Sequence, residues 1–357
     1  MTPGRPRPPH RFALLLALCA VTLTGVSVPA APQVSVLAGG LEVPWALAWA
    51  PDGRLFLTER PGRIRVVANG TLDPSPVATL PVTAVGESGL MGLALDPGFA
   101  SNGHLYVCST FDKRTAVVNR VTRLTLREGR AAAERVVLDD MPAARIHNGC
   151  RLTFGPDGML YVTMGDAAEP ALAQDPKSWA GKILRIAPDG SVPGDNPFAG
   201  SPVYSLGHRN PQGLAWERRG RLLAAEHGPR GRDEINHIQP GRNYGWPHVQ
   251  GRAETARDRE RFVDPLLESG RDTWAPGGIA VLDGHLYVAA LRGQRLLRVA
   301  LDVDLVVRRT ETLLAGTHGR LRDVVAGPDG ALYVATSNRD GRGSPARDDD
   351  RILRVVP

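Results

Sequence analysis

The chain repeats one local pattern six times: an apolar strand, a tight turn and a second apolar strand. The copies cover residues 45–59, 92–110, 151–166, 213–228, 278–291 and 323–337. Turn residues such as Pro-Asp-Gly separate strands rich in Val, Leu, Tyr and Ala, which is typical of β-hairpins. A hairpin cannot bury both faces alone, and regular repetition at such a period indicates a propeller or solenoid.

A further apolar strand follows several copies, and we expect it to be an outer strand of the same unit. These strands are residues 62–67, 121–126, 181–186, 295–300 and 351–356. A lone strand, residues 33–39, precedes the first copy. The pattern predicts an all-β, six-bladed β-propeller in which the N-terminal strand closes the last blade. Two packed sandwiches are the alternative, but the even spacing argues against them.

The N-terminal residues 1–31 have the pattern of a secretory signal. Basic residues between Arg5 and Arg11 precede an apolar run, Phe12 to Val28, and Val28-Pro29-Ala30 ends with a small residue. We therefore expect export to the periplasm or medium, with residues 32–357 forming the propeller domain. An uncleaved membrane anchor is the alternative, since the run is near the lower length for a span. No second such run exists, so the mature chain is expected to have no membrane span.

Composition restricts the partners and the redox chemistry of the chain. Its formal charge is +6, but no block of Lys and Arg with interleaved aromatics occurs, so a nucleic-acid partner is not expected. Arginines converging in a pocket fit an acidic small molecule better. The mature chain keeps Cys108 and Cys150, which an exported protein could join, although two buried free thiols are equally compatible with the sequence.

Residues 205–247 carry the most chemical information. Asn210 precedes Pro211, which biases it to an extended conformation and stiffens the loop that holds the Arg209 guanidinium. Gly228 and Pro229 follow an apolar strand, and their carbonyl oxygens could face a hard cation, which prefers oxygen ligands. Ordinary turn residues are the alternative for any one of these features, but the whole run is harder to explain in that way.

Four segments of this stretch have distinctive sequences: HRNPQG at 208–213, EHGP at 226–229, DEIN at 233–236 and NYGWP at 243–247. In this order and spacing they resemble the soluble quinoprotein glucose dehydrogenase and aldose sugar dehydrogenase family, also called glucose/sorbosone dehydrogenases. The resemblance extends over almost the whole mature chain. It implies a six-bladed β-propeller that binds pyrroloquinoline quinone (PQQ) and calcium.

The resemblance also assigns catalytic roles. His147 lies in a segment, 147–152, that is similar to the family's His-x-x-x-Arg-Leu, whose histidine is the catalytic base. An imidazole can take a proton from an alcohol at ordinary pH. Asp166 matches the aspartate that orients this histidine, and Arg209 matches the arginine beside the reactive quinone carbonyl.

The same resemblance assigns the residues that hold the cofactor and the metal. The cofactor-binding positions are Glu87, Arg209, Asn210, Arg292, Arg320 and Arg322. The metal-binding positions are Gly228 and Pro229, whose carbonyls hold the cofactor's calcium, and Glu234 and Tyr244, which are tied to a further calcium site. PQQ has three carboxylates, so converging arginines make electrostatic sense.

Three positions depart from the family pattern. Glu87 stands where Gln is common, and an ionised carboxylate cannot donate a hydrogen bond, so it is either protonated or has another role. Cys150 replaces a glycine close to His147, and Arg292 replaces a lysine. The chain also lacks some long insertions of the glucose enzyme and is more similar to the compact aldose sugar dehydrogenases.

The resulting hypothesis is an exported enzyme that oxidises an aldose at C1 to a lactone by hydride transfer to PQQ and passes the electrons to an unidentified external acceptor. A calcium-dependent propeller lactonase or hydrolase is the first alternative, and it should have side-chain carboxylates and amides at the central tunnel. A propeller that only binds carbohydrate is the second, because fold alone does not establish catalysis.

Overall fold

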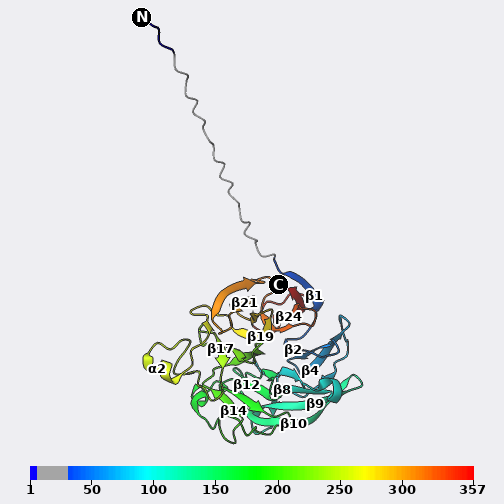
Figure 1. Cartoon of the computed structure of the whole chain (residues 1–357). Helices are drawn as coiled ribbons and strands as arrows, with labels where there is room; N and C mark the ends of the chain where they lie inside the picture. Colours follow the sequence, from blue (N-terminus) through cyan, green and yellow to red (C-terminus); the bar gives the residue numbers. More distant parts are fainter. Residues whose placement is uncertain (6–30) are drawn as a thin grey trace. The chain divides into compact units, whose positions relative to one another are not determined.

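Six antiparallel sheets follow one another around a ring in the computed structural model, which describes residues 1–5 and 31–357 (Figure 1). Five sheets have four strands and one has five. This arrangement, within residues 32–357, is the predicted six-bladed β-propeller. The predicted signal sequence falls mostly on residues 6–30, outside the described residues.

The first three blades are formed by consecutive stretches of the chain. Blade one contains β2 (Pro44–Trp49), β3 (Leu55–Glu59), β4 (Arg63–Ala68), β5 (Thr71–Leu72) and β6 (Ala78–Thr79). Blade two contains β7 (Leu90–Leu95), β8 (His104–Asp112), β9 (Val117–Arg127) and β10 (Arg130–Pro142). Blade three contains β11 (Leu152–Phe154), β12 (Leu160–Met164), β13 (Lys182–Ile186) and β14 (Val203–Leu206).

The next two blades repeat the same order. Blade four contains β15 (Pro211–Trp216), β16 (Leu222–Glu226), β17 (Glu234–Ile238) and β18 (Leu267–Glu268). Blade five contains β19 (Pro276–Leu282), β20 (His285–Ala290), β21 (Arg295–Leu301) and β22 (Val307–Leu313). The helices of the described residues are short: α1 (Phe99–Asn102), the 3-10 helix η1 (Pro170–Gln174) and α2 (Ala256–Arg261). None of them is long and apolar enough to cross a membrane.

The sixth blade joins the two ends of the propeller. It contains β23 (Leu321–Ala326), β24 (Leu332–Thr336) and β25 (Ile352–Val356), and β1 (Gln33–Ala38) pairs antiparallel with β25. Figure 1 shows β1 beside the C-terminus. The N-terminal strand therefore closes the last blade, as predicted, and holds the ring together with backbone hydrogen bonds from both chain ends.

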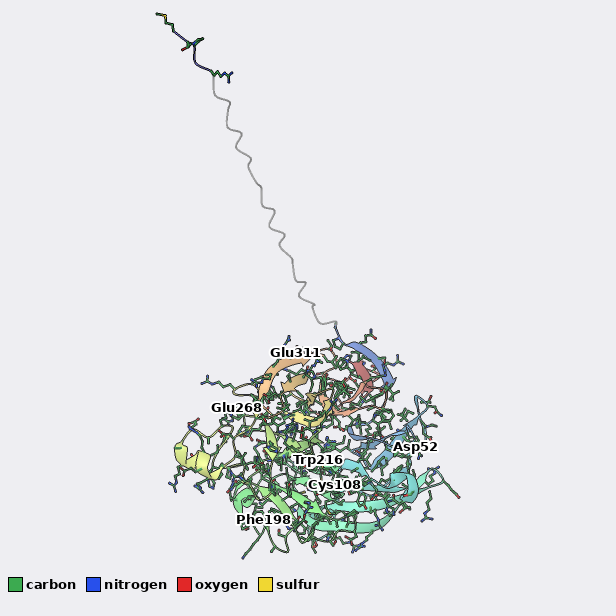
Figure 2. All side chains as sticks on the ribbon, in the orientation of Figure 1. Asp52, Cys108, Phe198, Trp216, Glu268 and Glu311 are labelled. Carbon is green, nitrogen blue, oxygen red and sulfur yellow. A yellow bond between two sulfur atoms is a disulfide. The ribbon has the colours of Figure 1, made fainter. Side chains whose placement is uncertain are left out.

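Buried apolar side chains from neighbouring blades pack together in continuous clusters. Figure 2 shows the side chains on the ribbon. The second strands β3, β12, β16 and β24 are buried along their whole length because a blade covers each face. Edge-to-face aromatic pairs connect adjacent blades: Tyr106 with Phe154 at 5.3 Å between ring centres, and Tyr161 with Trp216 at 5.0 Å. Such pairs add about 0.5–1.5 kcal/mol beyond area burial.

One expectation about the strands is wrong in detail. The strands at 62–67, 121–126, 181–186, 295–300 and 351–356 correspond to the third strands of their blades, β4, β9, β13, β21 and β25. A fourth strand lies outside each of them. Several of these, such as β5 and β18, have only two residues, which is too short for a periodic pattern to be recognised.

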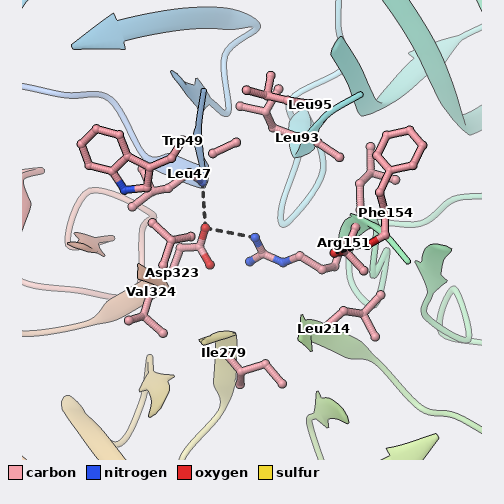
Figure 3. A pocket seen from close by; sticks show the side chains of 15 residues that line it. Leu47, Trp49, Leu93, Leu95, Arg151, Phe154, Leu214, Ile279, Asp323 and Val324 are labelled. Atoms are coloured by element: carbon pink, nitrogen blue, oxygen red, sulfur yellow. Dashed lines mark hydrogen bonds and ion pairs between the residues drawn. The ribbon is translucent and has the colours of Figure 1, made fainter. Parts of the chain in front are cut away.

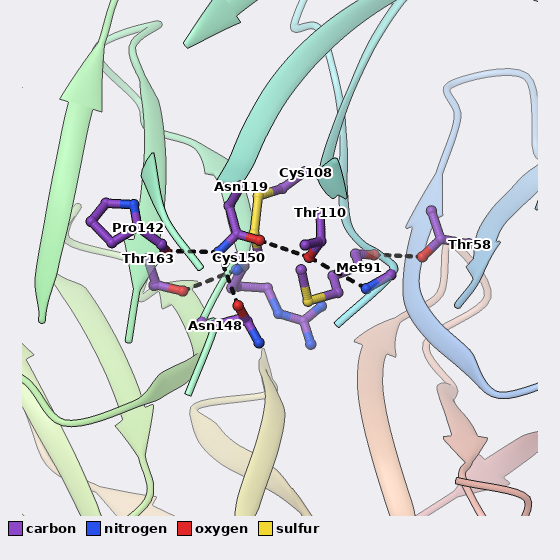
Figure 4. Close-up of a disulfide and its surroundings, with 12 residues drawn as sticks. Thr58, Met91, Cys108, Thr110, Asn119, Pro142, Asn148, Cys150 and Thr163 are labelled. Atoms are coloured by element: carbon purple, nitrogen blue, oxygen red, sulfur yellow. Dashed lines mark hydrogen bonds between the residues drawn. A yellow bond between two sulfur atoms is a disulfide. The ribbon is translucent and has the colours of Figure 1, made fainter. Parts of the chain in front are cut away.

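The two mature-chain cysteines form a disulfide between Cys108 of β8 and Cys150, just before β11 (Figure 4). Both side chains are fully buried. Of the two possibilities left open by the sequence, the structure has the bonded one, and the bond connects blade two to blade three.

Candidate active site

A cavity of about 650 Å³ opens at the face of the propeller where the innermost strands begin. Five loops that precede β7, β11, β15, β19 and β23 contribute to its wall. Its lining includes seven arginines, at positions 60, 145, 209, 292, 320, 322 and 342, and three carboxylates, Glu87, Asp233 and Asp340. This cavity, called the active-site cavity below, is within the usual size of small-molecule sites, about 300–1,000 Å³.

His147 lies at the wall of this cavity and is paired with a buried carboxylate. Its Nδ1 is 2.7 Å from Oδ1 of Asp166, which is fully buried. The other carboxylate oxygen accepts a hydrogen bond from the Trp246 indole N–H at 2.9 Å. Because the ionised carboxylate can only accept, the hydrogen-bond network assigns the imidazole proton to Nδ1 and leaves Nε2 free to take one.

The backbone around His147 is held at several points. His147 itself has a left-handed conformation, with φ of +60°. Its N–H donates to Glu87 Oε2 at 3.0 Å, and its carbonyl accepts from the Ala167 N–H at 3.2 Å. A Cβ on Gly165 would lie 1.9 Å from the His147 carbonyl oxygen, so only glycine fits there. These contacts give the ring one orientation without help from a ligand.

Glu87 supports this loop as an ionised group. Its second oxygen, Oε1, accepts from the Arg342 guanidinium at 2.7 Å. Burial acts to raise the pKa of Glu87, but the His147 N–H and the nearby charges of Arg342 and Arg322 outweigh it and hold the pKa below its usual range. Of the two roles considered from sequence, the geometry therefore favours a carboxylate that positions the His147 backbone.

Arg209 and Asn210 bring unsatisfied donors to the same region. The Arg209 backbone carbonyl accepts from the Asp166 N–H at 2.8 Å, and its guanidinium lies 5.3 Å from the centre of the Trp246 ring. Asn210 is fully buried, and its Oδ1 accepts from the Gly149 N–H at 3.1 Å. Arg209 Nε and Asn210 Nδ2 are buried without a partner in the described structure. Burial lowers the pKa of Arg209, so an anionic ligand beside it would offset the free-energy cost of burying its charge.

Arg320 and Arg322 share a carboxylate, that of Asp340. Arg320 Nε donates to Asp340 at 2.9 Å, and Arg322 Nη2 lies 3.7 Å from the same carboxylate. Arg322 Nη1 donates to the Gln212 side chain at 2.6 Å, while its Nε is buried without a partner among the described residues. Burial lowers the pKa of Arg322 to about 10. Arg292 also lines the cavity, but it is exposed at the edge.

The residues predicted to bind metal divide between two cavities. Gly228 lines the active-site cavity and also a neighbouring cavity of about 10 Å³, which Pro229, Glu234 and Tyr244 line. A Cβ on Gly228 would lie 2.0 Å from the Gly231 carbonyl oxygen, so this turn is closed to any side chain. Gly228 N–H donates to Asp233 at 2.9 Å, which places a carboxylate beside the Gly228-Pro229 peptide.

Glu234 and Tyr244 have polar partners within the protein. Glu234 accepts hydrogen bonds from the Gly251 N–H and the Asn236 amide, and burial, reinforced by Glu226, raises its pKa to about 8. The Tyr244 hydroxyl donates to the His237 carbonyl. Among the described residues no group of three or more His, Cys, Asp or Glu is arranged to hold a metal ion. A second calcium site at Glu234 and Tyr244 stays a prediction.

Several lining residues were not identified from the sequence: Arg60, Gln212, His227, Asp233, Asp340 and Arg342. Gln212 and His227 lie inside the motif run at 205–247 and could have been proposed from it. Asp340 and Arg342 lie in the last loop, before β25, and had no signal because their role depends on Arg320 and Glu87.

A second cavity, of about 240 Å³, lies along the central channel and is lined by residues of all six innermost strands (Figure 3). Most of the residues that line it have apolar side chains, and Arg151 pairs with Asp323 at 3.0 Å. Arg151 Nε also donates to the carbonyl of Gln212, which lines the active-site cavity, so this hydrogen bond connects the walls of the two cavities.

The propeller has a cavity rich in arginines, which suits anionic ligands, and a histidine supported by a carboxylate, which suits proton removal. Together these features are typical of an enzyme active site. The family model described as Glucose / Sorbosone dehydrogenase matches residues 41–353. The chain therefore belongs to the glucose/sorbosone dehydrogenase family and is an oxidoreductase of the sugar dehydrogenase class.

Three similar proteins support this membership. The chain is 30% identical to quinoprotein glucose dehydrogenase B of Acinetobacter calcoaceticus, over 97% of this chain and 96% of that one. It is 31% identical to aldose sugar dehydrogenase YliI of Escherichia coli strain K12, over 92% and 94%. The PQQ-bound aldose sugar dehydrogenase of Streptomyces coelicolor superposes with a TM-score of 0.84 at 40% identity, over 92% and 98%. The resemblance inferred from the motifs is confirmed.

Proposed function

We propose that this protein oxidises aldose sugars at C1 to lactones with bound PQQ and calcium. The observation that carries the proposal is the single cavity that brings His147, supported by Asp166, together with Arg209, Arg320 and Arg322. These groups come from blades three, four and six or from the loops that precede them, so only the closed ring assembles them.

The donors in the wall fit the proposed cofactor. Arg209 Nε, Asn210 Nδ2 and Arg322 Nε are buried, and no partner satisfies them within the described structure. A buried donor without an acceptor costs about 1–3 kcal/mol. Carboxylate and quinone oxygens would satisfy these donors, and the guanidinium fork suits a carboxylate in particular. Arg292 and the Arg320–Arg322 pair would hold the cofactor's acidic groups.

The peptide at Gly228 and Pro229 fits a hard cation. Backbone carbonyl oxygens are suitable calcium ligands, and the Asp233 carboxylate beside this turn adds negative charge. Asp233 also accepts from the Trp274 and Ala275 N–H groups, which fixes the loop before β19 against the same turn. In this role the turn supplies oxygen ligands and Asp233 holds them in place.

The chain's own residues would accept the proton of the substrate hydroxyl and hold the accepting histidine in position. When bound, PQQ supplies the two-electron acceptor that takes the hydride from C1. His147 accepts the proton of the C1 hydroxyl at Nε2, because Nδ1 is committed to Asp166. The Asp166 carboxylate stabilises the imidazolium that forms, and the Trp246 indole keeps that carboxylate in place. An external acceptor must remove two electrons in each turnover.

The lactonase alternative requires side-chain carboxylates and amides around a central metal. In the described part of the chain the channel instead has the Arg151–Asp323 ion pair, and the carboxylates of the active-site cavity accept from arginine or backbone donors. A binding-only propeller would not need a histidine held in one tautomer. Both observations favour the dehydrogenase.

Reconstitution tests the proposal directly. The mature protein, loaded with PQQ and calcium, should reduce an artificial dye when an aldose is added, and chelation of calcium should abolish this. His147→Gln should lower turnover by about 10²–10⁴-fold. His248→Gln is the matched control, since His248 is exposed and lies outside the active-site cavity. Equal turnover in His147→Gln, or lactone hydrolysis without dye reduction, would reject the mechanism.

Export is part of the proposal. It rests on the sequence pattern of residues 1–31 and on the Cys108–Cys150 disulfide, because such bonds persist in oxidising compartments. Mass spectrometry of the protein recovered outside the cytoplasm should give a chain that begins near residue 31 or 32. Recovery of full-length chain in the membrane fraction would favour the anchor instead.

A further inference from the structure

Six of the seven arginines of the active-site cavity fall into two groups by their position in the chain, and the seventh, Arg342, pairs with Glu87. Arg209, Arg292, Arg320 and Arg322, the proposed cofactor-binding group, come from the part of the chain that runs from the loop before β15 into β23. Arg60 comes from the loop before β4 in blade one, and Arg145 from the loop that joins β10 to β11, two residues before His147. The cofactor-binding proposal leaves this second pair without a role.

Both arginines are fixed next to the histidine through the Glu87 loop. The Arg145 carbonyl accepts from the Glu87 N–H at 2.8 Å, and Arg145 is two residues before His147. The Arg60 carbonyl accepts from the Leu90 N–H at 2.9 Å. A Cβ on Gly86 or Gly89 would collide with these two carbonyls, at 2.2 and 2.4 Å, so glycine permits the close approach. The same Glu87 binds the His147 N–H, which makes one connected unit.

Neither side chain has a hydrogen-bonded carboxylate among the described residues. Glu87 is engaged by the His147 N–H and Arg342, and Asp340 by Arg320. Arg60 is partly buried, and burial lowers its pKa although the nearby carboxylates of Asp340 and Glu87 act in the opposite direction. Arg145 is exposed at the mouth of the cavity, and Ile146 beside it offers an apolar contact.

The charge balance favours an additional anion. Arginines outnumber carboxylates by four in the lining of the cavity. A cofactor with three carboxylates, together with one divalent cation, would remove only one of these excess charges. A positive potential would therefore remain in the loaded site, to which Arg60 and Arg145 contribute. A cavity with low-dielectric walls focuses such a field.

We propose that the preferred substrates are aldoses with an anionic group away from C1, such as a uronate carboxylate or a sugar phosphate, and that Arg60 and Arg145 bind this group. The inference rests on the proposed dehydrogenase function. The chemistry at C1 is unchanged: the C1–H bond breaks, the hydride goes to the quinone, the hydroxyl proton goes to His147, and a lactone forms. An external dye acceptor takes the two electrons.

The test compares sugars that differ only in the acidic group. At low ionic strength the loaded protein should have KM values for glucuronate and glucose 6-phosphate about tenfold lower than for glucose. A preference for only one of the two identifies carboxylate or phosphate as the group that is bound. Half-molar salt should remove most of the difference, because the Debye length is then only about 4 Å. Equal KM values for the charged and neutral sugars at low salt would overturn the inference, while the dehydrogenase proposal would stand.

Binding provides a readout that does not depend on turnover. Methyl glucuronoside and methyl glucoside lack a free C1 hydroxyl, so calorimetry on the loaded protein measures only recognition. We expect the glucuronoside to bind about tenfold more tightly. Arg145→Gln should bring both the binding ratio and the KM ratio toward one, whereas Arg257→Gln, on the exposed surface of α2, should leave both ratios unchanged. An unchanged ratio in Arg145→Gln would refute the role of that residue. Failure of every aldose to reduce the dye would instead reject the dehydrogenase function.

Discussion

Loss of the Cys108–Cys150 bond should destabilise the propeller by a calculable amount. The bond closes a loop with a sequence separation of 42 residues. Loop-closure entropy for this length gives about 4 kcal/mol of stabilisation at 25 °C, because the crosslink restricts the unfolded chain. With an m-value of about 3 kcal/mol/M, the urea midpoint should fall by about 1.3 M.

The assay is equilibrium urea unfolding of the oxidised protein, with and without reductant, followed by tryptophan fluorescence. The double variant Cys108→Ala with Cys150→Ala is a second measurement, and it should be somewhat less stable than the reduced wild type because two buried side chains are truncated. A local effect should accompany the global one: amides of residues 143–150 should exchange faster, since Cys150 is three residues from His147. Equal midpoints with free thiols confirmed by titration would refute the reasoning.

Three further predictions concern the site. Asp166→Asn should lower turnover by about 10²–10⁴-fold, because the amide N–H₂ would face either the His147 Nδ1 proton or the Trp246 indole N–H. Steady-state dye reduction measures the turnover, and a near-normal rate would contradict the prediction. Glu87→Gln should lower the free energy of unfolding by about 1–3 kcal/mol at pH 7. Because the pKa of Glu87 is depressed in the folded protein, this stabilisation is present above about pH 4.5 and is lost as the pH falls through the lower folded value. The urea midpoints of wild type and variant should therefore converge in acid, and a difference that does not depend on pH would contradict this. Arg322→Gln should weaken PQQ binding to the calcium-loaded apoprotein by at least tenfold, measured by cofactor absorbance titration. The control is Arg354→Gln, at a half-buried residue of β25 outside the active-site cavity, and equal affinity in Arg322→Gln would remove Arg322 from the cofactor site.

The sequence predicted the blades well because each hairpin is a local structure. Alternating apolar strands and Pro-Asp-Gly turns determine β11–β12 and β23–β24 within about fifteen residues, and tertiary packing had only to stack them. Apart from β1, the fourth strands were missed, and two of them, β5 and β18, have only two residues and obtain their conformation from pairing with a neighbour. A local pattern carries little information about such edges.

The sequence analysis proposed the site residues that lie in recognisable motifs. It did not propose residues whose place in the site depends on a partner far away in the chain. His147, Asp166 and Arg209 are joined as expected: the imidazole contacts Asp166, and the Asp166 N–H donates to the Arg209 carbonyl. Asp340 and Arg342 were not found, because their partners, Arg320 and Glu87, are 20 and 255 residues away in the chain. The predicted metal positions Glu234 and Tyr244 came together beside a separate small cavity.

The amino-acid sequence alone determined the inner strands of the blades, the turns between them and the kinds of reactive group, since these depend on neighbours a few residues apart. Only the tertiary structure decided which groups share one cavity, which oxygens already have donors and where charge is left uncompensated. Ring closure through β1 and β25 brings distant loops to one face, and so Glu87 came to hold the His147 backbone while Arg60 and Arg145 stayed without bonded carboxylates among the described residues. The physical reason is that hydrogen bonds and desolvation depend on distances in space, which for residues so far apart in the chain are set by the fold.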